Sequence, residues 1–182
     1  MTDPTVLADA AAGRPDQVSL EDLRELARRV LSACGERGRR LATAESCTGG
    51  LVGHVLTEVP GASACYLGGA IAYADATKAA VLDVPQATLA RHGAVSAQTA
   101  VAMAEGVRRR LGADLALAVT GIAGPDGGTP DKPVGLTYVA VADGTGHEAR
   151  RFAWSGDRSA NKRASAAAAL DLALTRLSTA AD

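Results

Sequence analysis

The sequence predicts a single domain of the α/β class, a three-layer α/β/α sandwich built around a mixed sheet. Short apolar runs typical of buried strands alternate along the chain with longer segments whose apolar residues recur at helical spacing. Two of the strand-like runs flank the sequence DGTG at 143–146, which is a hairpin signal. Strands separated by helices favour parallel pairing and a hairpin pairs antiparallel, so the two patterns together indicate a mixed sheet with helices on both faces.

The segment 1–17 is predicted to be a flexible tail, and the domain is expected over 18–182. The tail is rich in Ala, Asp, Pro and Gly and shows no clear period. Ser19, followed by two acidic residues, has the character of a helix start, because a hydroxyl caps the first amides and acids favour the first turn. The apolar spacing after it predicts a helix over 20–37.

The remaining elements follow from the same two patterns. Strands are expected over 40–44, 68–73, 114–120, 136–142 and 148–154. Helices are expected over 48–57, 97–111 and 158–177, with a helical turn at 76–82 that stops near Pro85. Between 121 and 135 the density of Gly and Pro is too high for regular structure, so a loop is predicted there.

Composition disfavours several classes of function. Lys and Arg number 19 against 20 Asp and Glu, so no basic excess exists to neutralise a phosphate polymer, and no nucleic-acid partner is expected. The 3 cysteines have no CxxC spacing, which disfavours a disulfide framework or a zinc site, and reduced thiols fit a cytoplasmic protein. We find no signal peptide and no apolar stretch that could span a bilayer, so no membrane partner is expected.

The first candidate for chemistry is the run AESCTGG at 44–50, where a predicted strand ends and a helix begins. Proteins of the α/β class bind ligands at this carboxyl edge of the sheet, and helix N-terminal amides can hold an anion there. The Ser46 hydroxyl can attack a carbonyl while backbone N–H groups hold the oxyanion. The alternative is that Ser46 or Thr48 only caps the helix.

Cys47 is the competing nucleophile in this run, because a helix N-terminus lowers the pKa of a thiol. No histidine stands near it in the sequence to act as its base. His54, His92 and His147 are expected at the surface, so a Ser–His–Asp mechanism has little support.

The second candidate is the run YADATK at 73–78, at the end of another predicted strand. Lys78 can act as a base only when it is neutral, and burial or nearby cations would lower its pKa toward that state. The Tyr73 hydroxyl can relay a proton or orient the nucleophile. The alternative is a surface Lys with a half-buried Tyr, and a pairing between Asp75 and Lys78 would keep the amine charged.

The third candidate is the glycine-rich run at 120–135, which follows a predicted buried strand. Its length and composition indicate a loop shaped for a ligand. Thr120 and Gly121 can bring the backbone close to a flat ring or a ribose, and their N–H groups are candidates for an oxyanion hole, as are those at 46–48. The alternative is a structural Ω-loop.

Three runs of the sequence together resemble a known family: AESCTGG, TGIAGPDGGTPDKPVG, and SGDR followed by Arg163. They are similar to the carboxy-terminal domain of CinA-type competence/damage-inducible proteins, which also occurs alone as a nicotinamide-nucleotide amidohydrolase of the PncC type. The resemblance covers about residues 20–177. Without the larger amino-terminal domain of full CinA proteins, the sequence resembles the stand-alone enzyme.

The resemblance implies hydrolysis of nicotinamide mononucleotide to nicotinic acid mononucleotide and ammonia, which recycles the pyridine ring toward NAD. It implies a serine amidase that uses no metal and no other cofactor, and it suggests a homo-oligomer. Carried over residue by residue, the nucleophile falls on Ser46 and its catalytic partners fall on Tyr73 and Lys78.

The phosphate of this substrate needs hydrogen-bond donors. We expect them at the predicted helix start or from the basic residues near the C-terminus: Thr48, Gly49, Gly50, Arg158 and Arg163.

This chain departs from the family beside the base, where members usually read Tyr-Ser-Asn and it has Tyr73, Ala74 and Asp75. A non-catalytic nucleotide-binding or regulatory module and an amidase for a different amide are therefore the alternatives.

Overall fold

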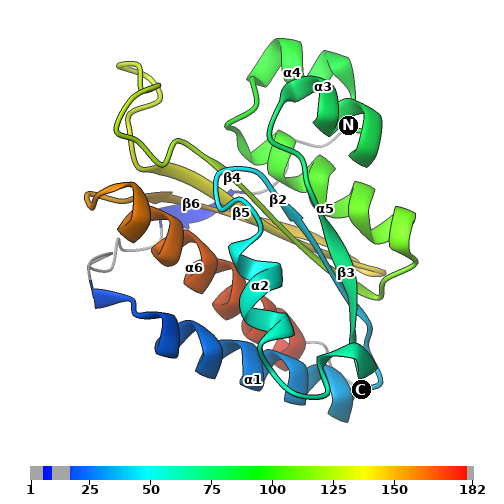
Figure 1. The fold of residues 1–182 in the computed structure, drawn as a ribbon. Helices are drawn as coiled ribbons and strands as arrows, with labels where there is room; N and C mark the ends of the chain where they lie inside the picture. The colour runs from blue at the N-terminus through cyan, green and yellow to red at the C-terminus, as the bar shows by residue number, and fades with distance from the viewer. Residues whose placement is uncertain (1–5, 10–16, 180–182) are drawn as a thin grey trace.

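A sheet of six strands lies between two layers of helices in the computed structural model, which describes residues 6–9 and 17–179 (Figure 1). Across the sheet the strands lie in the order β1 (Val6–Asp9), β6 (Gly146–Ala153), β5 (Leu136–Asp143), β4 (Leu115–Gly121), β2 (Leu41–Glu45) and β3 (Tyr66–Ile71). Strands β4, β2 and β3 run parallel, whereas β5 is antiparallel to both of its neighbours. The predicted mixed sheet with one hairpin is confirmed.

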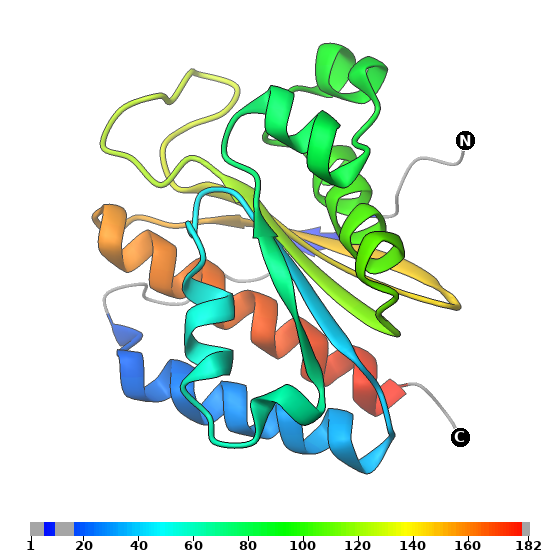
Figure 2. The same ribbon diagram turned by 45° about the vertical axis from the view of Figure 1, so that its right-hand side comes forward.

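Helices cover both faces of the sheet, which confirms the three-layer α/β/α sandwich (Figure 2). One layer consists of α1 (Leu20–Glu36), α2 (Leu51–Thr57) and α6 (Arg158–Thr179), and the other of α3 (Asp75–Leu82), α4 (Gln86–His92) and α5 (Ala97–Leu111). A short 3-10 turn at Ala62–Ala64 precedes β3. In the part of the chain that the structure describes, no helix is both long and apolar enough to cross a membrane.

The two faces of the sheet carry side chains of different size. Successive strand residues point to opposite faces. Toward α1 and α6 the central strands present Leu and Val, namely Leu41, Leu115, Leu117, Val119, Val139 and Val141. Toward α5 they present what we call the alanine face, namely Ala42, Ala44, Ala116, Ala118, Ala140, Ala142 and Ala149. The low aromatic content of the chain is thus matched by a layer built from methyl groups.

Helix α5 also packs tightly against α3, at Gly106. A Cβ built on this buried glycine would lie 1.9 Å from the carbonyl oxygen of Leu82 and 2.8 Å from its carbonyl carbon, so only glycine fits there. Leu82 is the last residue of α3 and lies one turn beyond Lys78. The contact between α3 and α5 therefore fixes the helix that carries Lys78.

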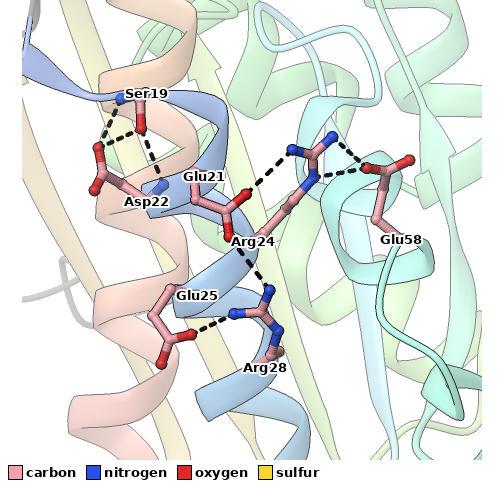
Figure 3. A network of polar contacts seen from close by, with 7 residues as sticks. All are labelled: Ser19, Glu21, Asp22, Arg24, Glu25, Arg28 and Glu58. Atoms are coloured by element: carbon pink, nitrogen blue, oxygen red, sulfur yellow. Dashed lines mark hydrogen bonds and ion pairs between the residues drawn. The ribbon is translucent and has the colours of Figure 1, made fainter.

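The start of α1 has the cap that the sequence predicts, shown with its neighbours in Figure 3. The Asp22 amide donates to Ser19 Oγ (3.1 Å) and the Ser19 amide donates to Asp22 Oδ2 (2.8 Å), which forms a capping box. Further along, Arg24 Nη2 lies 2.7 Å from Oε2 of Glu58, which joins α1 to the C-terminal end of α2. An exposed ion pair contributes about 0–1 kcal/mol, so the contact between these helices depends mainly on their buried apolar residues.

Two helices differ from the sequence prediction. Helix α2 begins at Leu51 rather than at residue 48, because Gly49 and Gly50 adopt left-handed φ values of 65° and 96° that are incompatible with a right-handed helix. Helix α4 was not predicted. Pro85, expected only as a stop, also forms the N-cap of α4, since its fixed φ suits a helix start and its missing N–H is not needed there.

Part of the predicted flexible tail forms a strand. Residues 6–9 are β1, which pairs in parallel with β6 at the edge of the sheet. An edge strand presents unpaired N–H and C=O groups that accept another strand, and the prediction from composition did not consider this partner. Residues 1–5 and 10–16 of the predicted tail lie outside the described residues.

Candidate active site

The segments that follow β2, β3 and β4 meet the start of α6 at the carboxyl edge of these parallel strands (Figures 1 and 2). The Ser46 amide donates to the carbonyl oxygen of Val119 in β4 (2.9 Å). The Ala72 amide, directly after β3, donates to the carbonyl oxygen of Glu45 (2.8 Å). The three candidate segments of the sequence therefore lie side by side.

Ser46 is the first residue after β2, and it is 6% exposed. Its carbonyl oxygen accepts from the Gly49 amide (3.1 Å), which closes a tight turn ahead of α2. The N-cap of α2 is Gly50, which supplies no side chain to cap the helix. Neither Ser46 nor Thr48 caps α2, so the capping alternative is wrong and the Ser46 hydroxyl has no structural task at the helix start.

The side chain that caps α2 is Glu45, which sequence reasoning missed. Its carboxylate is 2% exposed, and it accepts from the backbone amides of Gly50 (Oε2, 3.0 Å), Val52 (Oε2, 3.1 Å) and Gly53 (Oε1, 2.8 Å). The signal in the sequence was an acidic residue ahead of a helix that lacks a side-chain cap of its own. Because the Gly50 amide donates to Glu45, it is not free for the phosphate contact expected of it.

Lys162 of α6 is a second residue that sequence reasoning missed. A Cβ built on Gly49 would lie 3.5 Å from Lys162 Nζ, so the ammonium group lies over the turn that contains Ser46. Lys162 stands four residues after Arg158, one turn along the same helix face, and that spacing was the available signal. By contrast, the Thr48 hydroxyl expected to bind phosphate is fully buried and has no hydrogen-bond partner.

Lys78 is buried beside this turn, which contradicts the alternative of a surface lysine. Its side chain is 1% exposed, Nζ donates to the carbonyl oxygen of Tyr73 (2.8 Å) and Nζ lies 3.5 Å from Asp75 Oδ1. Burial lowers the pKa of Lys78, while the Asp75 carboxylate opposes that shift. Among the described residues no hydrogen bond joins Lys78 Nζ to Ser46, although the charge of Lys78 influences the pKa of the adjacent Cys47.

Tyr73 and Arg158 meet at the entrance to this region. The Tyr73 side chain is exposed, and its hydroxyl accepts from Arg158 Nη2 (3.3 Å). Arg158 Nη1 donates to the carbonyl oxygen of Gly124 in the glycine-rich loop (2.7 Å). A cavity of about 520 Å³ lies between this loop and the start of α6, lined by residues 123–125, Val134 and residues 156–159.

Both walls of this cavity are held by Asn161, a further residue that sequence reasoning missed. Its side chain is 1% exposed, Nδ2 donates to the carbonyl oxygen of Ala123 (3.1 Å), and Oδ1 accepts from the Gly156 amide (3.0 Å). The glycine-rich loop is therefore tied to the start of α6 by a buried amide. This contact and the cavity favour a ligand-binding loop over a purely structural one.

Three residues predicted to contact the substrate make contacts within the fold. The Thr120 hydroxyl is buried and donates to the carbonyl oxygen of Ala94 (2.8 Å). Gly121 lies so close to β5 that a Cβ there would be 2.6 Å from Thr137 Oγ1. Arg163 Nε donates to the carbonyl oxygen of Val18, ahead of α1 (2.7 Å). The Thr120 hydroxyl and the Arg163 Nε group are thus occupied by backbone carbonyls.

The environment of Cys47 does not activate it as a nucleophile. Its side chain is buried, and burial raises the pKa of the thiol to about 12. The histidines are placed elsewhere: His54 lies in α2, His92 ends α4, and His147 Nδ1 contacts Glu105 Oε1 at 2.9 Å. Ser46 and Lys78 therefore remain the candidate nucleophile and the candidate base.

The fold and the site define an α/β domain with a serine in the turn after one parallel strand, β2, and a buried lysine in the helix after the neighbouring strand, β3. The sequence profile of the CinA C-terminal domain matches residues 23–177. The chain belongs to this family.

Individual relatives agree with this assignment. A CinA-like protein from Geotalea uraniireducens is 54% identical over 129 residues, which cover 71% of this chain and 31% of that protein. One from Anaeromyxobacter sp. (strain K) is 51% identical over 157 residues, covering 86% of this chain and 38% of that protein. The chain thus spans about a third of the length of these curated relatives.

A solved structure shows the same fold over nearly its whole length. The crystal structure of competence/damage inducible protein CihA from Agrobacterium tumefaciens is similar with a TM-score of 0.83 and 41% sequence identity, over 87% of this chain and 96% of that one.

Proposed function

We propose that this chain hydrolyses the carboxamide of nicotinamide mononucleotide to nicotinic acid mononucleotide and ammonia. The observation that carries the proposal is the fully buried Lys78 beside the Ser46 turn, where burial lowers the lysine pKa and no histidine competes as base. A buried lysine with a lowered pKa, near a serine that has no capping task, is what a serine–lysine amidase needs as its base and nucleophile.

In the proposed mechanism Ser46 Oγ attacks the carboxamide carbon and its proton passes to neutral Lys78, directly or through the Tyr73 hydroxyl. Lys78 then protonates the departing ammonia, and water cleaves the acyl-enzyme to release the acid. In the structure Lys78 Nζ donates to the carbonyl oxygen of Tyr73, and catalytic hydrogen bonds are often completed only when substrate binds. Proton transfer of this kind contributes about 10²–10⁴-fold to the rate.

The substrate phosphate is proposed to lie on the α6 side of the site. Glu45 already accepts the first amides of α2, so that helix start carries no free positive end for a second anion. Arg158, which lines the cavity of about 520 Å³, and Lys162, whose Nζ lies over Gly49, instead present two cations from one face of α6. Ligand pockets typically measure about 300–1,000 Å³, so a mononucleotide fits this volume.

The test is ammonia release from nicotinamide mononucleotide by the purified protein, with the acid product identified by mass. A folded protein that binds the nucleotide without releasing ammonia would favour the non-catalytic nucleotide-binding module. Release from other amides but not from this one would favour an amidase with a different substrate.

Lys162→Met is expected to raise KM for nicotinamide mononucleotide about 10–100-fold with little change in kcat. A charge-assisted hydrogen bond contributes about 1.5–3 kcal/mol, and each 1.4 kcal/mol is about tenfold in affinity. KM for nicotinamide riboside, which lacks the phosphate, should stay unchanged. Arg28→Gln, which removes a cation from the exposed face of α1, is the control. Equal effects on both substrates would contradict phosphate binding by Lys162.

Asp75→Asn is expected to shift the pH dependence of kcat/KM to lower pH. Only the neutral amine of Lys78 accepts a proton, so activity rises as pH rises through the pKa of Lys78. Asp75 raises that pKa against the effect of burial, and the amide removes the opposing charge, so the rising limb moves down. Glu36→Gln, at the far end of α1, should leave the limb in place. A limb that moves up after Asp75→Asn would rule out Lys78 as the base.

A further inference from the structure

We propose that Glu45 is a positioning residue for Ser46, which holds the nucleophile through the turn at 46–50 without touching the substrate. The inference rests on the proposed amidase function, since it assigns a role within the same reaction. It starts from a buried carboxylate whose partners are all backbone amides.

The Glu45 carboxylate has no cationic partner among the described residues, yet it is 2% exposed. Burying a carboxylate is costly unless its charge is balanced by hydrogen bonds. Here the amides of Gly50, Val52 and Gly53 supply that balance from the positive end of α2. A Cβ at Gly53 would lie 2.8 Å from Tyr66 Oη, so this glycine leaves room for the Tyr66 hydroxyl beside the carboxylate.

The backbone of Glu45 ties the same point to β3. Its carbonyl oxygen accepts from the Ala72 amide (2.8 Å), and Tyr73 follows directly. The next amide, that of Ser46, donates to Val119 in β4 (2.9 Å). Glu45 therefore stands where the ends of three strands and the start of α2 are joined.

Within the turn itself the Cys47 side chain packs in the apolar core, and no other described side chain supplies a hydrogen-bonding anchor. The N-cap Gly50 has no side chain, and the Thr48 hydroxyl has no hydrogen-bond partner. The left-handed glycines at 49 and 50 make the turn possible but do not fix its position. The Glu45 carboxylate is thus the polar side chain that ties the end of this turn to β2, beside Ser46.

Glu45→Gln replaces one acceptor oxygen by an NH₂ group that faces helix amides, so at least one hydrogen bond is lost and two donors oppose each other. A misplacement of about 1 Å at a reacting group can cost about 10²-fold in rate. We expect kcat to fall about 100-fold while KM changes less than about threefold, because the phosphate lies on α6.

The experiment compares wild type, Glu45→Gln and Glu58→Gln. Glu58 is the matched control, because it stands at the other end of α2 in an exposed ion pair with Arg24. The unfolding midpoint of each variant is measured first. Below that temperature, kcat and KM for nicotinamide mononucleotide are measured, together with the rate at which phenylmethylsulfonyl fluoride labels Ser46, followed by mass. Glu45→Gln should lose kcat and labelling rate by similar factors, and Glu58→Gln should match wild type.

Each other outcome counts against a defined part of the idea. If Glu45→Gln has the kcat and the labelling rate of wild type, or if only its KM changes, the positioning role is overturned. If wild type is labelled at Ser46 but releases no ammonia, the proposed substrate is wrong. The labelling rates alone would then decide the role of Glu45. If Glu45→Gln does not fold, Glu45→Asp keeps the charge with a shorter reach, and wild-type labelling in that variant would overturn the proposal.

Discussion

Ser46→Ala is expected to lower kcat for ammonia release by about 10³–10⁶-fold, the range seen when the nucleophile of a serine hydrolase is removed. The backbone hydrogen bonds of Ser46 to Val119 and Gly49 do not use its hydroxyl, and the hydroxyl does not cap α2. The variant should therefore keep its fold, with an unfolding midpoint within about 2 °C of wild type. Steady-state kinetics and thermal unfolding on the same samples check both parts.

The neighbouring thiol provides the control for this prediction. Cys47→Ala should retain activity within a few-fold, because burial keeps the thiol protonated with a pKa of about 12. Lys78→Met should abolish activity like Ser46→Ala. The double variant Ser46→Ala/Lys78→Met should lose no more activity than either single variant, since the effects of residues that act as a unit are not additive. Loss of activity in Cys47→Ala but not in Ser46→Ala would identify the thiol as the nucleophile.

Gly106→Ala is expected to destabilise the fold by about 1–3 kcal/mol, the usual range for overpacking a core. Alanine in a helix interior is normally favoured over glycine by about 1 kcal/mol. At this position the new methyl group would lie 1.9 Å from the carbonyl oxygen of Leu82, so the clash outweighs the gain in helix propensity. The unfolding midpoint should fall by about 2–10 °C, and kcat should fall because α3 carries Lys78.

Gly144→Ala is the matched control for this clash. A Cβ on Gly144, in the β5–β6 hairpin, meets nothing within 4 Å, so the same change should leave stability and kcat near wild type. A stable, fully active Gly106→Ala would show that α3 can move without consequence for the site.

Much of the fold could be predicted from apolar spacing alone, because the core elements bury one face or both. Helix α5 was predicted with the same bounds as observed, since Ser96 caps it and its apolar residues keep helical spacing. Helix α4 was missed because its 7 residues are too few to show a period and Pro85 was interpreted only as a stop. Strand β1 was missed because its partner, β6, lies far away in the sequence.

The site was partly predictable for a related reason. Ser46 directly follows β2, and both Tyr73 and the helix that carries Lys78 follow β3, so the meeting of parallel strand ends at one edge of the sheet predicted their proximity. The tasks of Glu45, Lys162 and Asn161 depend on partners that only the folded chain brings near. The same holds for Arg163, whose partner Val18 lies 145 residues away.

The alanine face has a consequence for how this protein tolerates change. A methyl side chain cannot be reduced except to glycine, and any larger side chain would push α5 away from the sheet. Since α5 supports α3 through Gly106, and α3 carries Lys78, the layer acts as a spacer that sets the depth of the lysine. Substitutions on the alanine face should therefore lower kcat before they prevent folding. On the leucine and valine face, side chains of similar volume can replace one another more freely.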